Sequence, residues 1–242
     1  MPREHTYLAI ILKKQPFGDA DELVTIFTQE AGKLRAVAKS VKLPKSKLQH
    51  AIQVPFLVRL RLADGQLPKV IGAEVQNSFG HIRHSLESLA AAFYVLELIL
   101  KFTADEHPSA KLFKLAKDFL EFLDRIPAKA GAGLLLAIVK FQIRFLDAVG
   151  LSISAPAKAG ARELYFSNSH GGFTANSGAA VPATAGAYEL YQKLTQGQAG
   201  APDFRPDAAA AAELRALLSQ FLEYHLERRV KSERFLKQSG VV

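Results

Sequence analysis

The sequence predicts an α+β protein with an N-terminal five-stranded β-barrel of the OB type, followed by a mainly α-helical domain. The first observation is a set of five short apolar stretches, separated by turn signals, within the first 80 residues. The second is a change of period after residue 80, where apolar residues recur three and four positions apart. We therefore expect a barrel domain at 1–80 and a helical domain at 81–242, with a loop-rich insertion at 151–187.

The five stretches of the first 80 residues have the side-chain pattern of strands. In the fourth stretch Val58, Leu60 and Leu62 alternate with Arg59 and Arg61, which gives one apolar and one basic face. Five strands joined by short turns suit a small barrel, because closure of the sheet removes its edges. The predicted strands are Tyr7–Lys13, Leu23–Thr28, Lys33–Ser40, Val54–Ala63 and Lys69–Gln76.

The helical region contains several amphipathic stripes with plausible ends. Gly150 follows one stripe as a C-terminal stop, and Asp207 precedes another as an N-terminal cap. Within the insertion we expect a hairpin of Glu163–Phe166 and Gly172–Ala175, and we read residues 197–207 as a linker. The predicted helices are Ile82–Leu100, Leu112–Ile126, Leu134–Val149, Ala187–Thr195 and Ala208–Glu227.

Composition excludes several classes of function. The 242 residues include no cysteine, which excludes disulfides, a thiol nucleophile and a thiolate zinc site. The sequence also lacks the GxxxxGK[ST], GxGxxG, GxSxG and HExxH motifs. The longest apolar run, Leu89–Leu100, is short for a membrane span and contains Glu97. We therefore expect a cytoplasmic protein that is not an enzyme, binds no cofactor or metal and does not enter membranes.

Two small clusters of polar residues leave alternatives open. His81 and His84 lie three residues apart on a predicted helix and could share a metal, but no third ligand lies nearby, so surface polar residues are the simpler interpretation. Asp19, Asp21 and Glu22 could hold a cation or act as a base. A solvated turn that caps the next segment explains the same acidic cluster.

A strongly basic segment gives the main indication of function. The net charge is +8, and the stretch from Ala31 to Ala63 contains basic residues but no acidic one. A basic run is often only a solvated face, but here the charges have one sign and occur on both strands and loops, which favours a polyanion ligand. Phe17 could stack on bases. The candidate DNA-binding residues are Lys33, Arg35, Lys39, Lys42, Lys45, Lys47, Arg59 and Arg61.

Four segments in the same order resemble the RecO family of recombination mediators. They are DADELVTIFTQEAGKLRAVAKSVKLPKSKL in the barrel region, FGHIRHSLESLAAAFYVLEL after it, and then FQIRFLDAVGL and FLEYHLERRVKSERFL. The resemblance implies a protein that binds single- and double-stranded DNA and anneals complementary strands. It also implies action with RecR and the acidic tail of single-stranded DNA-binding protein (SSB), and through these an indirect role in loading RecA.

The resemblance raises the question of where the tail of SSB binds. An acidic ligand with an apolar tip needs cations around a hydrophobic slot. Lysines beside the Leu- and Phe-rich stripes are candidates, although they could equally form the solvated face of ordinary helices. They are Lys101, Lys111, Lys114 and Lys117. Two other functions stay open: an OB-fold RNA-binding factor without annealing activity, and a helical adaptor whose barrel only touches membranes or acidic proteins.

Three departures from the family pattern predict local differences. Many relatives carry a zinc ribbon of four cysteines in the insertion, so we expect a metal-free remnant here. An extra residue near Val54 predicts a bulge. Glu227 and Glu233 replace the usual Gly and Arg, which predicts a longer last helix and a weaker basic patch. The approximate equivalents of the four cysteines are Pro156, Ala159, Ala175 and Gly178.

Overall fold

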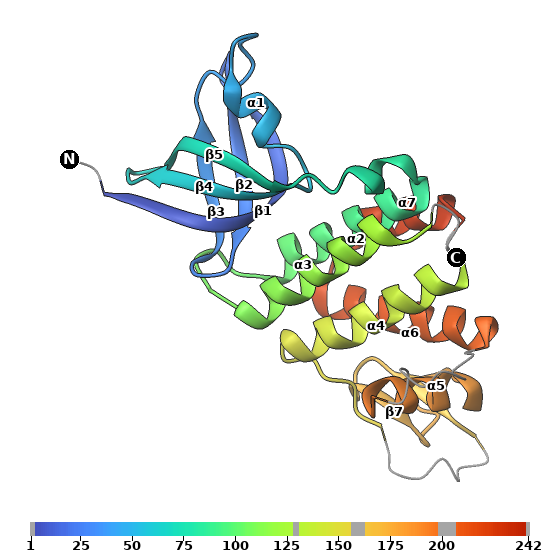
Figure 1. Cartoon of the computed structure of the whole chain (residues 1–242). Helices are drawn as coiled ribbons and strands as arrows, with labels where there is room; N and C mark the ends of the chain where they lie inside the picture. The colour runs from blue at the N-terminus through green and yellow to red at the C-terminus, as the bar shows by residue number, and fades with distance from the viewer. Residues whose placement is uncertain (1–2, 128–130, 156–162, 198–206, 241–242) are drawn as a thin grey trace. The chain divides into compact units, whose positions relative to one another are not determined.

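The computed structural model describes residues 3–127, 131–155, 163–197 and 207–240 (Figure 1). The chain forms two compact units, Met1–Ala128 and Lys129–Val242. The first contains a five-stranded barrel and two long helices, and the second contains helices and a small three-stranded sheet. The predicted α+β class, with a barrel before a mainly helical region, is confirmed.

The barrel of the first unit is closed in the strand order β1-β2-β3-β5-β4. All neighbouring strands are antiparallel except β3 and β5, which pair in parallel at Val37–Lys69 and Ala38–Val70. A register shift in β1 between Ile11 and Lys13 bends this long strand around the barrel. The strands are β1 (Glu4–Phe17), β2 (Asp21–Thr28), β3 (Gly32–Ala38), β4 (Leu57–Ala63) and β5 (Lys69–Asn77).

The alternation predicted for the fourth strand defines the inside of the barrel. Val58, Leu60 and Leu62 are buried in the barrel core, while Arg59 and Arg61 between them are exposed. Residues two apart on a strand point to the same face, so this strand contributes one complete apolar row. The other strands contribute the remaining core side chains, among them Ala9, Ile11, Val24, Ile26, Ala36, Ala38 and Val70.

The chain between β3 and β4 differs from the expectation. A short helix, α1 (Lys47–Ala51), was not predicted, because five residues give too little periodicity to identify a helix. The predicted bulge at Val54 is wrong: Val54 precedes β4, which begins at Leu57, and is joined to Pro55 by a cis peptide bond. The additional residue thus lies in the connection and not in the strand.

Three helical elements complete the first unit. They are η1, a 3-10 helix (Gly80–His84), α2 (Leu86–Phe102) and α3 (Ala110–Arg125). The predicted start of the first long helix at Ile82 is wrong, because Ser85 is extended and its side chain caps α2 by accepting from the Ser88 N–H. Ser109 caps α3 in the same way, accepting from the Leu112 N–H.

Close packing joins the barrel to the segment between α2 and α3. A Cβ at Gly32 would lie 2.3 Å from the His107 carbonyl oxygen, so the tight turn before β3 requires glycine at this contact. Phe27 of β2 packs near Phe113 of α3, with ring centroids 6.0 Å apart. Arg83 of η1 lies over the Phe56 ring, 4.9 Å from its centroid.

In its described residues, the second unit contains four helices and the hairpin of the predicted insertion. Its helices are α4 (Ala132–Ala148), α5 (Ala185–Thr195), α6 (Ala208–Leu226) and α7 (Lys231–Gln238). Strands β6 (Tyr165–Ser167) and β7 (Gly172–Thr174) form the hairpin, and β8 (Val181–Pro182) adds a third strand. Asp207 caps α6, and Gly150 follows α4 with a positive φ of 80°, as predicted.

Aromatic side chains hold the hairpin against the helices of the second unit. Phe166 meets Phe173 and Phe221 edge-on, and Phe173 meets Tyr188 in the same manner. The Tyr191 hydroxyl donates to the Ile153 carbonyl, and burial raises the pKa of Tyr191 to about 12. Two of the four predicted cysteine equivalents, Pro156 and Ala159, lie outside the described residues. The contacts of Phe166 and Phe173 show that the hairpin core is built of rings, which prefer edge-to-face contact.

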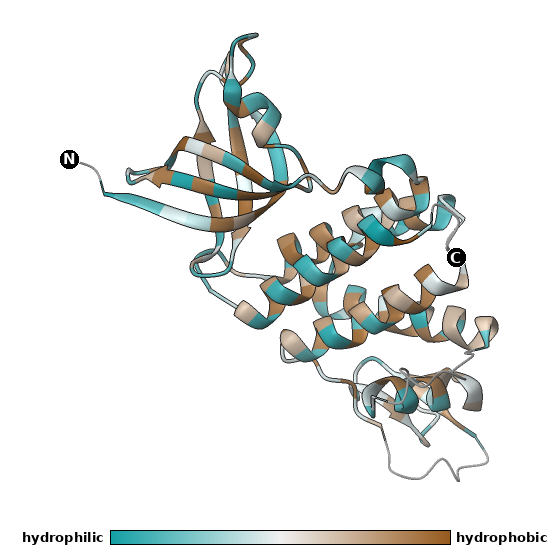
Figure 2. Ribbon diagram, in the orientation of Figure 1, coloured by the Kyte–Doolittle hydropathy of each residue, from teal (hydrophilic) through white to brown (hydrophobic). Residues whose placement is uncertain are grey.

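The last helix does not run on as predicted. α6 ends at Leu226 because Glu227 adopts a left-handed conformation with φ 51°. α7 begins at Lys231, four residues after Glu227. Figure 2 shows hydrophilic and hydrophobic positions intermixed along α6. In the ranges that the structure describes, every helix is too short or too polar to cross a membrane.

Candidate nucleic-acid interface

The eight predicted DNA-binding residues fall into three groups in the first unit. Lys33 and Arg35 lie on β3, and Arg59 and Arg61 lie on β4. We call the other four residues, which follow β3, the loop cluster. It consists of Lys39, Lys42, Lys45 and Lys47, the last being the first residue of α1.

The Lys33 side chain binds other residues of the first unit and is largely buried there. Its side chain is only 11% exposed, and its Nζ lies 3.3 Å from Asp105 Oδ1. The same ammonium donates to the carbonyl oxygens of Leu100 and Thr103 at the end of α2. Since an ammonium has three donors, these contacts occupy them all. Arg35 also faces Asp105, at 3.4 Å, but its side chain is 59% exposed and can still reach a ligand.

The loop cluster is placed at one end of the barrel by contacts with the β1–β2 turn. Lys39 Nζ lies 2.8 Å from Asp21 Oδ2, and the Ser40 N–H donates to Asp21 Oδ1. These bonds hold the pKa of Asp21 below its ordinary value, and the bond from Lys39 has the largest effect. Lys42 donates to the carbonyl oxygens of Gly18 and Asp19 in the same turn. Within the predicted acidic cluster, the Asp21 carboxylate and the Asp19 carbonyl thus fasten the basic loop, whereas Glu22 pairs with Lys14 at 3.2 Å.

The outer part of the loop cluster faces solvent. The side chains of Lys45 and Lys47 are exposed and have no hydrogen bond or ion pair to any part of the chain that the structure describes. Phe17, at the end of β1 beside the same turn, is 44% exposed. Figure 2 colours the loops at this α1 end of the barrel mainly as hydrophilic. Exposed cations and an exposed ring on connected loops are what a single strand needs for its phosphates and bases.

The arginines of β4 form a separate group. Arg59 is opposite Glu74 on β5, which offsets part of its charge. Arg61 crosses the backbone of Gly72, where a Cβ would meet its Nε at 2.9 Å. Arg59 pairs in register with Leu8, nine residues from Phe17 on β1. At about 3.3 Å per residue, the β1 position paired with Arg59 lies roughly 30 Å along the strand from Phe17. The arginines of β4 are therefore separated from the turn that holds the loop cluster.

The lysines predicted to receive the tail of SSB are mostly paired along their own helices. Lys101 contacts Glu97 at 2.8 Å, Lys114 contacts Asp118, and Lys117 contacts Glu121 at 2.8 Å. Each pair joins residues four apart, which are neighbours on a helix surface. The fourth residue, Lys111, lies exposed on the first turn of α3. Partner binding at these lysines stays a prediction.

Comparison with known proteins covers nearly the whole chain. The family described as Recombination protein O N terminal matches residues 1–79, and Recombination protein O C terminal matches residues 83–234. The chain belongs to the RecO family. A DNA repair protein RecO from Myxococcus xanthus (strain DK1622) is 31% identical over 248 residues, covering 96% of this chain and 97% of the relative.

Other RecO proteins match to a similar extent. DNA repair protein RecO of Pelotomaculum thermopropionicum is 30% identical, covering 96% of this chain and 93% of its own length. The RecO protein of Geobacter metallireducens is also 30% identical, covering 95% of this chain and 96% of its own length. Family membership supports a role in DNA repair and recombination, which agrees with the basic barrel.

Sequence reasoning missed a second group of cations on α7 of the second unit, where it predicted a weak basic patch. The signal was present as a repeat of basic residues three apart, at Lys231, Arg234 and Lys237. The histidine pair on η1 belongs to a different question, that of a metal site. His81 lies 3.8 Å from Asp124, which agrees with its interpretation as a surface polar residue. Among the described residues there is no group of three or more side chains that could hold a metal ion.

Proposed function

We propose that this protein binds single-stranded DNA through the loop cluster, with Phe17 stacking on a base, and that it also binds duplex DNA. The observation that carries the proposal is the exposure of Lys45 and Lys47 in a loop that Lys42 joins to the turn directly after the exposed Phe17. Each phosphate that a lysine neutralises releases counterions, which makes such binding favourable at low salt. Lys33 is left out of the interface because its ammonium is occupied.

The fuller role is that of a recombination mediator. The protein anneals complementary strands and acts with RecR and the tail of SSB to help RecA load onto coated single strands. Relatives named as DNA repair proteins over nearly the full length support this role. We further propose that the protein works in the cytoplasm, holding strands together without catalytic chemistry and without a cofactor or metal.

A strand-annealing assay tests the proposal. Complementary oligonucleotides coated with SSB should anneal faster with the full-length protein, and K45E/K47E should slow this annealing. The matched control is R144E/K193E, which changes the same charge at exposed positions of α4 and α5. No acceleration by the unmodified protein would contradict the proposal. Tight binding of RNA with no annealing would instead favour an RNA-binding factor.

A further inference from the structure

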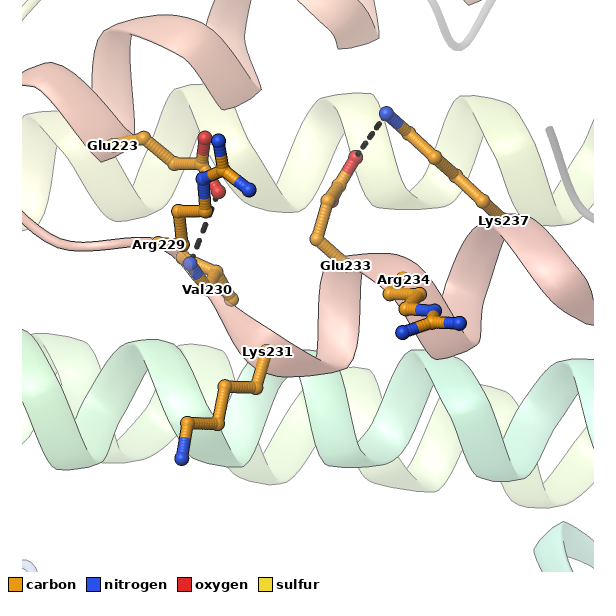
Figure 3. A pocket seen from close by; sticks show the side chains of 7 residues that line it. All are labelled: Glu223, Arg229, Val230, Lys231, Glu233, Arg234 and Lys237. Carbon is orange, nitrogen blue, oxygen red and sulfur yellow. Dashed lines mark hydrogen bonds and ion pairs between the residues drawn. The ribbon is translucent and has the colours of Figure 1, made fainter.

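A pocket in the second unit lies between the end of α6 and α7. It has a volume of about 700 Å³. Figure 3 shows charged side chains from both helices around it. The cations come from α7 and from Arg229, two residues before it, whereas Glu223 comes from α6. The lining residues are Glu223, Arg229, Val230, Lys231, Glu233, Arg234 and Lys237.

A buried ion pair fixes α7 in place. Arg215 of α6 is 2% exposed, and its Nη1 lies 2.9 Å from Glu233 Oε1 on α7. A second contact, from the Val230 N–H to Glu223 Oε1, holds the start of α7 against α6. Because a buried charge is costly without its partner, these contacts define the position of the short helix. The cations that α7 carries are therefore presented on a fixed frame.

The pocket has an excess of positive charge. Arg229, Lys231, Arg234 and Lys237 face two carboxylates, and one of these, Glu233, already neutralises the buried Arg215. Lys237 is 3.8 Å from Glu233 and remains 63% exposed. An excess of cations around a concave surface attracts an anionic ligand.

We propose that this pocket is a second DNA-binding site, which takes the phosphodiester backbone of a single strand. The cations at 231, 234 and 237 extend about 9 Å along α7, at 1.5 Å per residue. Each strand of a DNA duplex has a phosphate about every 3.4 Å of helix axis, so a more extended single strand places about two phosphates over that length. The site lets one chain hold a second strand while the loop cluster holds the first. This inference rests on the proposed binding of DNA.

The lining favours a nucleic-acid backbone over an acidic peptide with an apolar tip. Such a peptide needs an open hydrophobic slot as well as cations. Val230 is the apolar residue among those that line the pocket, and it is 4% exposed, so the apolar surface of the pocket comes from the methylene stems of its charged side chains and not from an open hydrophobic slot. A phosphodiester backbone requires only charge and hydrogen-bond donors, and two guanidinium groups supply donors in the fork geometry that phosphate accepts.

The test is a bridging experiment with the full chain. One oligonucleotide is immobilised, and retention of a second, labelled and non-complementary oligonucleotide is measured after the protein is added. R234E/K237E should abolish retention, and R144E/K193E should preserve it. On the K45E/K47E background, R234E/K237E should also lower the slope of log K against log salt by about 1.4, at about 0.7 for each phosphate contact to a single strand.

Each outcome distinguishes this inference from the proposed function. Retention by R234E/K237E equal to that of the control overturns the second site but leaves the barrel site standing. No binding of DNA by the unmodified protein overturns both. If R234E/K237E loses binding of an acidic tail peptide but bridges DNA as before, the pocket binds a peptide partner and the inference is overturned. R234Q/K237Q, checked by circular dichroism, gives the same readings without bringing new carboxylates close to Glu233.

Discussion

Strand β3 and the loop after it carry similar basic residues but use them differently. Lys33 on β3 lies beside the segment that follows α2, and its ammonium is surrounded by three acceptors. Lys45 and Lys47 lie in the connection between β3 and β4 and are exposed. The comparison shows that a run of one charge in a sequence can combine structural and ligand-binding residues. What separates them is the part of the fold that each one faces.

The largest effect should come from removing the buried ammonium. Lys33→Met leaves the carbonyls of Leu100 and Thr103 without their donor, so we expect the free energy of unfolding to fall by about 3 kcal/mol. Urea denaturation measures this change, with the exposed Lys47→Met as a control that should stay within about 0.5 kcal/mol. DNA affinity of the folded Lys33→Met protein should be unchanged. A loss of affinity with normal stability would put Lys33 in the interface.

Charge reversal in the loop should have the opposite profile. We expect K45E/K47E to leave the urea midpoint unchanged and to weaken single-strand binding about tenfold at low salt. The slope of log K against log salt should fall by about 1.4 if both lysines contact phosphates. Fluorescence anisotropy with several unrelated oligonucleotides checks that the loss is uniform across sequences. Unchanged affinity would remove the loop from the proposed site.

A smaller effect should separate stacking from charge. Phe17→Ala should cost about 1 kcal/mol of single-strand binding, at the lower end for one stacked base, because the ring is only partly exposed. The salt slope should not change, since no charge is removed. Leu43→Ala is the control, because Leu43 is 50% exposed in the neighbouring loop but offers no ring. Equal losses in both variants would indicate general loop damage and not stacking.

Releasing a cation should strengthen binding slightly. Asp21→Asn removes the partner of Lys39, so we expect DNA affinity to rise by a factor of about two to five at low salt. The lowered pKa of Asp21 means that its ion pair stabilises the fold above the ordinary carboxyl pKa. That contribution is lost as the pH falls through the lowered value. Asp21→Asn should therefore flatten the acid limb of a stability–pH curve, and an unchanged limb would contradict the assignment.

The hairpin of the second unit should show no effect when metals are removed. A chelator should leave the thermal midpoint unchanged, because aromatic contacts among Phe166, Phe173 and Phe221 hold the hairpin. Elemental analysis should find no stoichiometric zinc, since a structural site normally needs four ligands and the chain has no cysteine. About one zinc per chain would contradict this prediction.

Long periodic segments made most of the fold predictable from the sequence. The alternation in β4 and the stripes of α3 and α4 each extend over enough residues to distinguish a strand from a helix. Short elements such as α1 and the 3-10 helix η1 gave no such signal. The break at Glu227 was missed because a left-handed glutamate has no sequence signature comparable to glycine.

The candidate site was only partly predictable, for a physical reason. Composition located the basic segment, but pairing between distant parts of the chain decided which charges stay available. Lys33 meets a carboxylate 72 positions away at Asp105, and no local pattern reveals such a contact. In contrast, Lys39 pairs with Asp21 in a turn that had already been recognised as an acidic cluster.

The aromatic hairpin also affects how this chain withstands oxidants. Peroxide oxidises thiolates first, and thiolate zinc sites depend on those same sulfur atoms. The one sulfur atom among the 242 residues belongs to Met1. Rings packed edge to face offer no comparable target. The fold of this DNA repair protein therefore contains no thiolate, the group that oxidants attack first. Oxidants that damage a chromosome cannot disrupt the fold by that route.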